Sequence, residues 1–151
     1  MRELLTSDFS AAGRDCSVSI ITASDDRGVY HVGGRVGASA GPLKLLECFS
    51  KILVGTNEKL HAPIKKSKNG LVKILVDRGF KLGKQVQDGH KNLRNRVLQA
   101  HQNNLFSIVL GGGHDYGFPH IAGVIDSLPT KAKVGVINMD AHFDLRPVER
   151  I

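Results

Sequence analysis

Compact apolar runs recur along the chain and predict a set of buried strands. The first run, residues 17–22, is rich in β-branched side chains, which favour extended backbone. Each run is apolar at consecutive positions, so both faces of the strand are expected to be covered by other elements. Four segments share this pattern and are predicted as strands: residues 17–22, 71–76, 105–110 and 134–139.

Apolar residues between these runs follow a helical period. Residues 41–53 open with Gly41-Pro42, and proline is tolerated in a first helical turn because its missing N–H needs no partner there. The apolar stripe of this helix falls at i, i+1, i+4, i+7 and i+8, at Leu45, Leu46, Phe49, Ile52 and Leu53.

Two further helices are predicted, and polar segments separate the elements. The helix at 88–102 is expected to place Leu93, Val97, Leu98 and His101 on one side. The helix at 116–128 is expected to turn Phe118, Ile121, Ala122 and Ile125 inward. Residues 23–28 are predicted as a polar loop and residues 55–70 as a mobile one.

Strands that are apolar on both faces and alternate with helices predict an α/β fold. A mainly parallel sheet would lie between two helical layers. At 151 residues the chain is long enough for one such domain, residues 1–151, and too short for two of ordinary size. Chemistry in such folds collects at the carboxyl ends of the strands.

The net charge of +7 raises the question of a nucleic-acid partner. The positive residues are scattered, apart from Lys65, Lys66 and Lys68. No segment interleaves basic and aromatic residues in the way that base stacking requires. We therefore expect a solvated, lysine-rich surface and no nucleic-acid partner.

The cysteines and the N-terminal residues indicate a cytoplasmic, soluble protein. Cys16 and Cys48 lack metal-ligand spacing and are expected to be buried free thiols. The first residues contain no apolar signal-peptide core. No apolar run approaches the ~18 residues of a membrane span, so no membrane partner is expected.

Residues that bind metals gather directly after two of the predicted strands. The sequence Gly-Gly-Gly-His at 111–114 follows the strand at 105–110. The sequence Asp-Ala-His-Phe-Asp at 140–144 follows the strand at 134–139. Parallel strands end at the same edge of a sheet, so these two motifs are expected to meet.

The two motifs together supply a mixed nitrogen and oxygen ligand set. Alternate residues of an extended chain project to one side, so Asp140, His142 and Asp144 can line one cavity. His114 can complete this set, which suits a divalent metal such as Mn²⁺. Taken singly, His114 could instead be held by backbone groups, and Asp140 could cap a strand end. The complete constellation favours the metal.

A glycine-rich segment and two arginines are further candidates for ligand contacts. Residues 33–38, Gly-Gly-Arg-Val-Gly-Ala, lack the following Lys-Ser/Thr of a phosphate-binding P-loop, so a turn is the better interpretation. Arg35 and Arg146 are candidate substrate anchors, although exposed arginines commonly serve only the surface.

Three blocks of the sequence resemble the N-terminal half of arginase-family ureohydrolases, and within that family the formimidoylglutamase branch. The blocks are residues 33–38 with Gly41-Pro42, residues 110–114, and residues 138–146. Their order and separation also match. The resemblance implies a three-layer arginase-like α/β/α fold, here incomplete at its C-terminal side, with two manganese ions at the strand ends.

The resemblance also implies roles for individual residues. His114, Asp140 and Asp144 would bind one manganese, and Asp140 would bridge to a second, which His142 also binds. A hydroxide held between the ions at Asp140 would attack the amidine carbon of a small-molecule substrate; no side chain is assigned as catalytic in its own right. Formimidoylglutamate would yield glutamate and formamide, a step of histidine degradation.

The residues that follow Asp140 bear on the choice of substrate. Phe143-Asp144-Leu145-Arg146 favours formimidoylglutamate, because arginase-like members more often carry Thr at position 143. Arg146 is our candidate partner for the substrate carboxylate. The alternative is arginase- or agmatinase-type attack on a guanidinium carbon, with release of urea.

The family pattern also includes a later S-x-D-x-D segment with two further aspartate ligands, which this sequence does not contain. We therefore expect impaired manganese binding and little or no catalysis by this chain alone, as for a truncated enzyme. Two other hypotheses remain. One is a non-catalytic remnant that acts as a structural or binding module, in the form of a homo-oligomer. The other is a separate chain that supplies the missing half.

Overall fold

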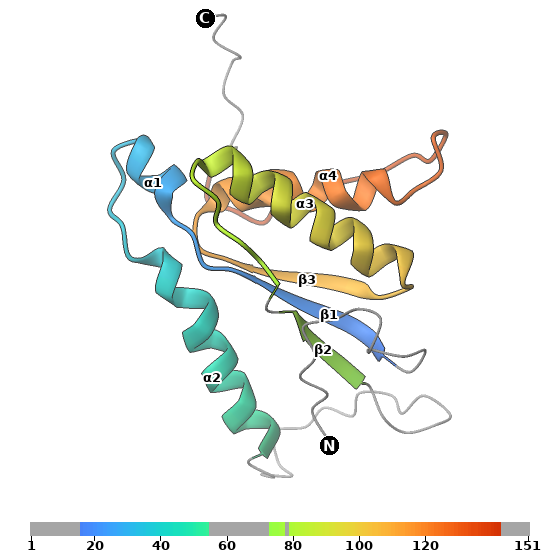
Figure 1. The fold of residues 1–151 in the computed structure, drawn as a ribbon, viewed down its shortest axis with the longest axis horizontal. Helices are drawn as coiled ribbons and strands as arrows, with labels where there is room; N and C mark the ends of the chain where they lie inside the picture. Colours follow the sequence, from blue (N-terminus) through green and yellow to red (C-terminus); the bar gives the residue numbers. More distant parts are fainter. Residues whose placement is uncertain (1–15, 55–72, 78, 143–151) are drawn as a thin grey trace, which may run out of the picture.

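Three parallel strands form a single sheet in the computed structural model, which describes residues 16–54, 73–77 and 79–142. The central strand is β1 (Cys16–Ala23), and β2 (Lys73–Asp77) and β3 (Phe106–Gly111) pair with it on either side. Figure 1 shows the resulting order β2-β1-β3. The predicted parallel sheet is therefore confirmed.

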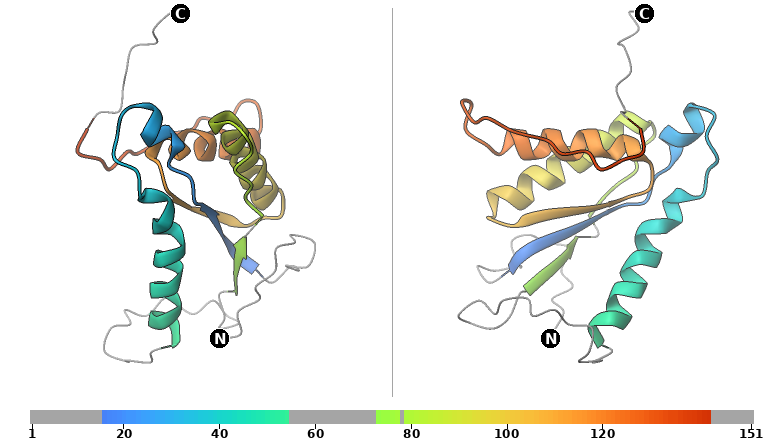
Figure 2. Two further views of the ribbon diagram at one scale, coloured as in Figure 1. Left: turned by 60° about the vertical axis from the view of Figure 1, so that its left-hand side comes forward. Right: turned by 180° about the vertical axis from the view of Figure 1, so that it is seen from behind.

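Helices cover the two faces of this sheet. The helices α3 (Val86–Gln102) and α4 (Gly117–Asp126) lie together on one face, and α2 (Gly41–Val54) lies on the opposite face (Figures 1 and 2). This is the three-layer α/β/α arrangement that the sequence predicts. A short helix, α1 (Arg27–His31), begins inside the segment predicted as a loop.

The core lies between the sheet and α3. Leu93 and Val97 of α3 are fully buried against Ile21 and Ala23 of β1 and against Tyr116. The helical period predicted the side of α3 that carries Leu93 and Val97 correctly. The chain enters α3 through a capping box, in which Gln85 and Asp88 each accept from the other's backbone N–H.

Small residues set the contact between α3 and α4. A Cβ atom at Gly123 would lie 2.6 Å from the carbonyl oxygen of Arg94 and 2.7 Å from Cβ of Val97. Glycine at this position therefore lets the two helices approach closely. The buried residues of α4 are Pro119 and Gly123.

This packing overturns the predicted inward face of α4. Phe118, Ile121 and Ile125 are exposed, and Phe118 retains 72% of its accessible surface. They lie outside the contact because α4 meets α3 through its small residues. On α2, Leu45 and Phe49 are likewise exposed.

The predicted strand at 134–139 is absent. After α4 the chain turns and runs back along that helix as an extended segment without strand pairing (Figure 2). The segment is exposed, and Ile137 keeps 90% of its accessible surface. A strand needs a neighbouring backbone for its hydrogen bonds, and the described part of the chain places no strand beside these residues.

Three further predictions concern the cysteines, the loop at 55–70 and membrane spans. Cys48 is a free thiol, as expected, but it is exposed rather than buried. The predicted loop at 55–70 lies outside the described residues. None of the helices in the described ranges combines the length and apolar character needed to cross a bilayer.

Candidate metal centre

A turn of three glycines ends β3 and delivers His114. The N–H of Gly112 donates to the carbonyl of Ala23 at 2.9 Å, and the N–H of Gly113 donates to the carbonyl of Asp25 at 2.8 Å. A Cβ atom at Gly112 would lie 2.4 Å from the carbonyl oxygen of Asp25. The close approach between the ends of β1 and β3 therefore requires glycine at this position.

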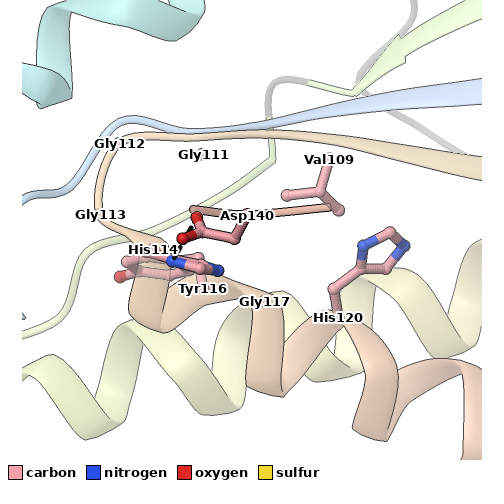
Figure 3. A pocket seen from close by; sticks show the side chains of 9 residues that line it. All are labelled: Val109, Gly111, Gly112, Gly113, His114, Tyr116, Gly117, His120 and Asp140. Carbon is pink, nitrogen blue, oxygen red and sulfur yellow. Dashed lines mark ion pairs between the residues drawn. The ribbon is translucent and has the colours of Figure 1, made fainter. Parts of the chain in front are cut away.

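Asp140 lies between two imidazoles and presents a different oxygen to each. Its Oδ2 is 3.8 Å from Nδ1 of His114, and its Oδ1 is 3.1 Å from Nδ1 of His142. The backbone N–H of His142 donates to the same Oδ1 at 2.8 Å. Figure 3 shows His114 and Asp140 facing each other beside the triple glycine.

The surroundings of Asp140 favour its ionised form. Hydrogen bonds from the backbone N–H and the side chain of His142 lower the pKa of Asp140, and electrostatic interaction with His114 and His142 acts in the same direction. Metal ligation requires the carboxylate rather than the acid. The imidazoles are accessible to ions from solvent, since the side chains of His114 and His142 are 60% and 83% exposed.

The two oxygens of Asp140 are divided between the two imidazoles. Three of the four predicted ligands come together, with one oxygen of Asp140 toward each imidazole. Within the described ranges, no three His, Cys, Asp or Glu side chains converge tightly enough to enclose a single ion. Asp144 and the candidate substrate anchor Arg146 lie outside those ranges, whereas Arg35 is exposed on the loop that follows α1.

A cavity of about 410 Å³ adjoins these residues. Figure 3 shows the side chains around it, and the backbone of the triple glycine forms part of its wall. The lining comprises Val109, Gly111, Gly112, Gly113, His114, Tyr116, Gly117, His120 and Asp140. His120 was missed by the sequence analysis; its position six residues after His114 was the available signal.

A buried ionic network holds the end of β1 against the segment that carries His114. The carboxylate of Asp25 is 2% exposed and accepts from the Arg27 guanidinium at 2.8 Å and from the hydroxyl of Tyr116 at 2.6 Å. Burial opposes its ionisation, but these hydrogen bonds prevail and lower the pKa of Asp25 to about 2. Burial and the bond to Asp25 raise the pKa of Tyr116.

Arg27 extends this network to the loop before α3. Its guanidinium donates to the backbone carbonyls of Leu82, Gly83, Lys84 and Gln85. Asp25 and Arg27 directly follow β1. Their position after a strand was therefore the same signal that pointed to His114 and Asp140, and the sequence analysis did not apply it to them.

A histidine–aspartate pair fixes the residue after His114. Nε2 of His90, on α3, lies 2.5 Å from Oδ2 of Asp115. The His90 ring also meets the Tyr116 ring edge-on, with a centroid separation of 5.0 Å. The short 3₁₀ helix His114–Tyr116 is therefore anchored at both residues that follow His114.

Several known proteins are similar to this chain in sequence. The chain is similar to formimidoylglutamases from Klebsiella pneumoniae (35% identity over 129 residues, 85% of this chain and 36% of the relative). A formimidoylglutamase from Lysinibacillus sphaericus is 31% identical over 151 residues, 99% of this chain and 42% of the relative. A third, from Streptococcus gordonii, is 35% identical over 134 residues, 87% of this chain and 37% of the relative.

The chain thus spans about two fifths of the length of these relatives. No solved structure matches it. The model of the arginase family matches residues 17–150, which include all three described ligand candidates and the motifs at 111–114 and 140–144. With its parallel sheet and its His114–Asp140–His142 arrangement, the chain belongs to the arginase family.

Proposed function

We propose that the candidate metal centre serves manganese-dependent hydrolysis of linear amidine C–N bonds, with formimidoylglutamate as the substrate. One observation carries the proposal: Asp140 offers one carboxylate oxygen to His114 and the other to His142. A carboxylate can bridge two ions in this way, with one oxygen for each ion. The formimidoylglutamases among the relatives support the choice of substrate.

Each ligand candidate has a separate task in this proposal. His114 and Oδ2 of Asp140 would hold one ion, and His142 and Oδ1 the other. Asp144 is proposed as a further ligand of the first ion. Bound manganese would lower the pKa of a water molecule and so supply the nucleophile. The protein's own contribution is His114 and an ionised Asp140 in the lining of a cavity, with His142 beside Asp140.

The cavity beside the ligands is suited to a small linear substrate. Its volume of about 410 Å³ lies within the range of small-molecule sites, and the glycine backbone at 111–113 leaves room for close approach. Arg146 remains our proposed partner for a glutamate-type carboxylate. The site thus combines a place for the reacting carbon with a candidate anchor for the substrate's acidic end.

We expect little or no turnover by these 151 residues alone. His114 and His142 are largely exposed, and among the described residues no group of three His, Cys, Asp or Glu side chains could hold one ion. The same exposure favours the second candidate function, a folded module without catalysis.

A chimaera tests the proposed function. The 151 residues replace the matching 42% of the Lysinibacillus sphaericus formimidoylglutamase, and formamide release is measured with manganese present. We expect hydrolysis of formimidoylglutamate, its loss in Asp140→Asn, and retention in Asp126→Asn, which alters a carboxylate on α4 that pairs with Arg94. The proposal fails if the folded, manganese-loaded chimaera is inactive. It also fails if the chimaera releases urea from arginine or agmatine instead of formamide from formimidoylglutamate.

A further inference from the structure

A buried serine joins two histidines from different helices. Oγ of Ser107, on β3, lies 3.0 Å from Nε2 of His101 on α3 and 3.0 Å from Nε2 of His120 on α4. Ser107 is 5% exposed, and both rings are half-buried. The three side chains therefore form a continuous hydrogen-bonded chain across α3, β3 and α4.

The two histidines of this hydrogen-bonded group lie in different surroundings. His120 lines the cavity that also contains His114 and Asp140 (Figure 3). His101 lies in the last turn of α3. Burial, with a smaller effect of nearby His101, lowers the pKa of His120. The neutral form of the His120 ring is therefore favoured at the cavity end.

A serine hydroxyl carries one proton and can donate to only one ring at a time. When Ser107 donates to Nε2 of His101, Nε2 of His120 is free to donate to Ser107. In this arrangement both hydrogen bonds point from His120 toward His101. Both bonds point the other way after a proton has passed.

We propose that His120, Ser107 and His101 form a proton-transfer path between the cavity beside the candidate metal centre and the solvent at the end of α3. A proton arriving at Nδ1 of His120 releases the Nε2 proton to Oγ of Ser107. The original hydroxyl proton passes to Nε2 of His101, and His101 loses its Nδ1 proton to water. One proton crosses, and both rings end neutral in the opposite tautomer.

The use of this path rests on the proposed function. Hydrolysis of an amidine takes a proton from the attacking water and returns one to the departing nitrogen. The path through Ser107 would give the buried Nε2 side of the His120 ring its own route to solvent, on the side away from the cavity. His120 and His101 act here as proton carriers and not as ligands of the metal.

Proton exchange along this path can be measured on the full chain without metal or substrate. With ¹⁵N-labelled imidazoles, NMR gives the rate at which the His120 ring N–H exchanges with water. We expect His101→Gln to slow this exchange at least tenfold, because a glutamine amide can still bond to Ser107 but cannot accept and release a proton. Ser107→Ala should slow it as well. Ser127→Ala, which removes a hydroxyl bonded to the carbonyl of Val124, is the control and should not.

The path is refuted if exchange at His120 is as fast in His101→Gln as in the unaltered chain while the amide spectrum stays folded. It is also refuted if Ser127→Ala slows exchange as much as His101→Gln does. None of these exchange measurements needs hydrolysis. Failure of the proton path can therefore be distinguished from failure of the proposed function. In an active chimaera, His101→Gln should lower kcat and leave KM unchanged.

Discussion

The hydroxyl of Tyr116 donates to the carboxylate of Asp25 over 2.6 Å, although 91 positions separate the two residues in the sequence. This bond ties the end of β1 to the short helix that begins at His114. The position of His114 therefore depends on a buried polar contact as well as on the glycine turn.

Removing the hydroxyl in Tyr116→Phe should destabilise the fold. Asp25 would stay buried and charged with one donor fewer, and a hydrogen bond to a charged group contributes about 1.5–3 kcal/mol. Urea denaturation should report this loss in the free energy of unfolding. Tyr30→Phe is the matched control, because Tyr30 is exposed, and it should change stability by less than about 0.5 kcal/mol. Equal effects of the two variants would contradict the role of this bond.

Acid should remove the contribution of Asp25. Its pKa is about 2 in the folded chain, against an ordinary value of 3.8, so the folded state favours the charged form. The corresponding stabilisation, about 2 kcal/mol, is present above pH 4 and is lost as the pH falls from about 4 toward 2. Denaturant unfolding at successive pH values measures this slope. Asp25→Asn should flatten it, and an unchanged slope in that variant would show that another group is responsible.

His120 should make the stability of the fold depend on pH in a higher range than Asp25 does. Burial and the nearby His101 lower its pKa below the ordinary 6.5, so the folded chain favours the neutral ring. Its contribution is present above about pH 6.5 and decreases as the pH falls below that value. His120→Asn should reduce the loss of stability between pH 7 and 5. His31→Asn, at an exposed position on α1, is the control and should follow the unaltered chain.

Alanine at position 112 should be poorly tolerated. Its Cβ would meet the backbone of Asp25 at 2.4 Å, and backbone cannot move aside as a flexible side chain can. We expect a loss of about 2 kcal/mol or more together with displacement of His114. Gly41→Ala is the matched control, since Gly41 has right-handed helical backbone angles and nothing within 4 Å of the added atom. That variant should be neutral or slightly stabilising. If both variants unfold at the same urea concentration, the close approach at Gly112 is unimportant.

The sequence predicted those features that local patterns determine. Leu93 and Val97 recur at the helical period and form the core, and the apolar run at 17–22 became the central strand. The run at 134–139 has the same character but no neighbouring described strand, so its pattern alone could not make it a strand. Its place in a sheet depends on partners that a local pattern does not contain.

The sequence likewise predicted only part of the candidate metal centre and its surroundings. The prediction that the two motifs meet rested on two parallel strands; His114 and Asp140 do lie close together, but the strand expected before Asp140 is absent. The bond between Asp25 and Tyr116 joins distant segments, and no spacing rule reveals it. The contact of Ser107 with two histidines likewise depends on how α3 and α4 pack on β3.

Manganese binding by the full chain tests the central claim most directly. Titration followed by electron paramagnetic resonance gives the affinity of the unaltered chain, of Asp140→Asn, and of Asp126→Asn as the charge-matched control. We predict measurable binding that falls at least about tenfold in Asp140→Asn and is unchanged in Asp126→Asn. Equal affinity in all three proteins, or no binding by the unaltered chain at millimolar manganese, would contradict the assignment of Asp140 as the carboxylate shared by two ions.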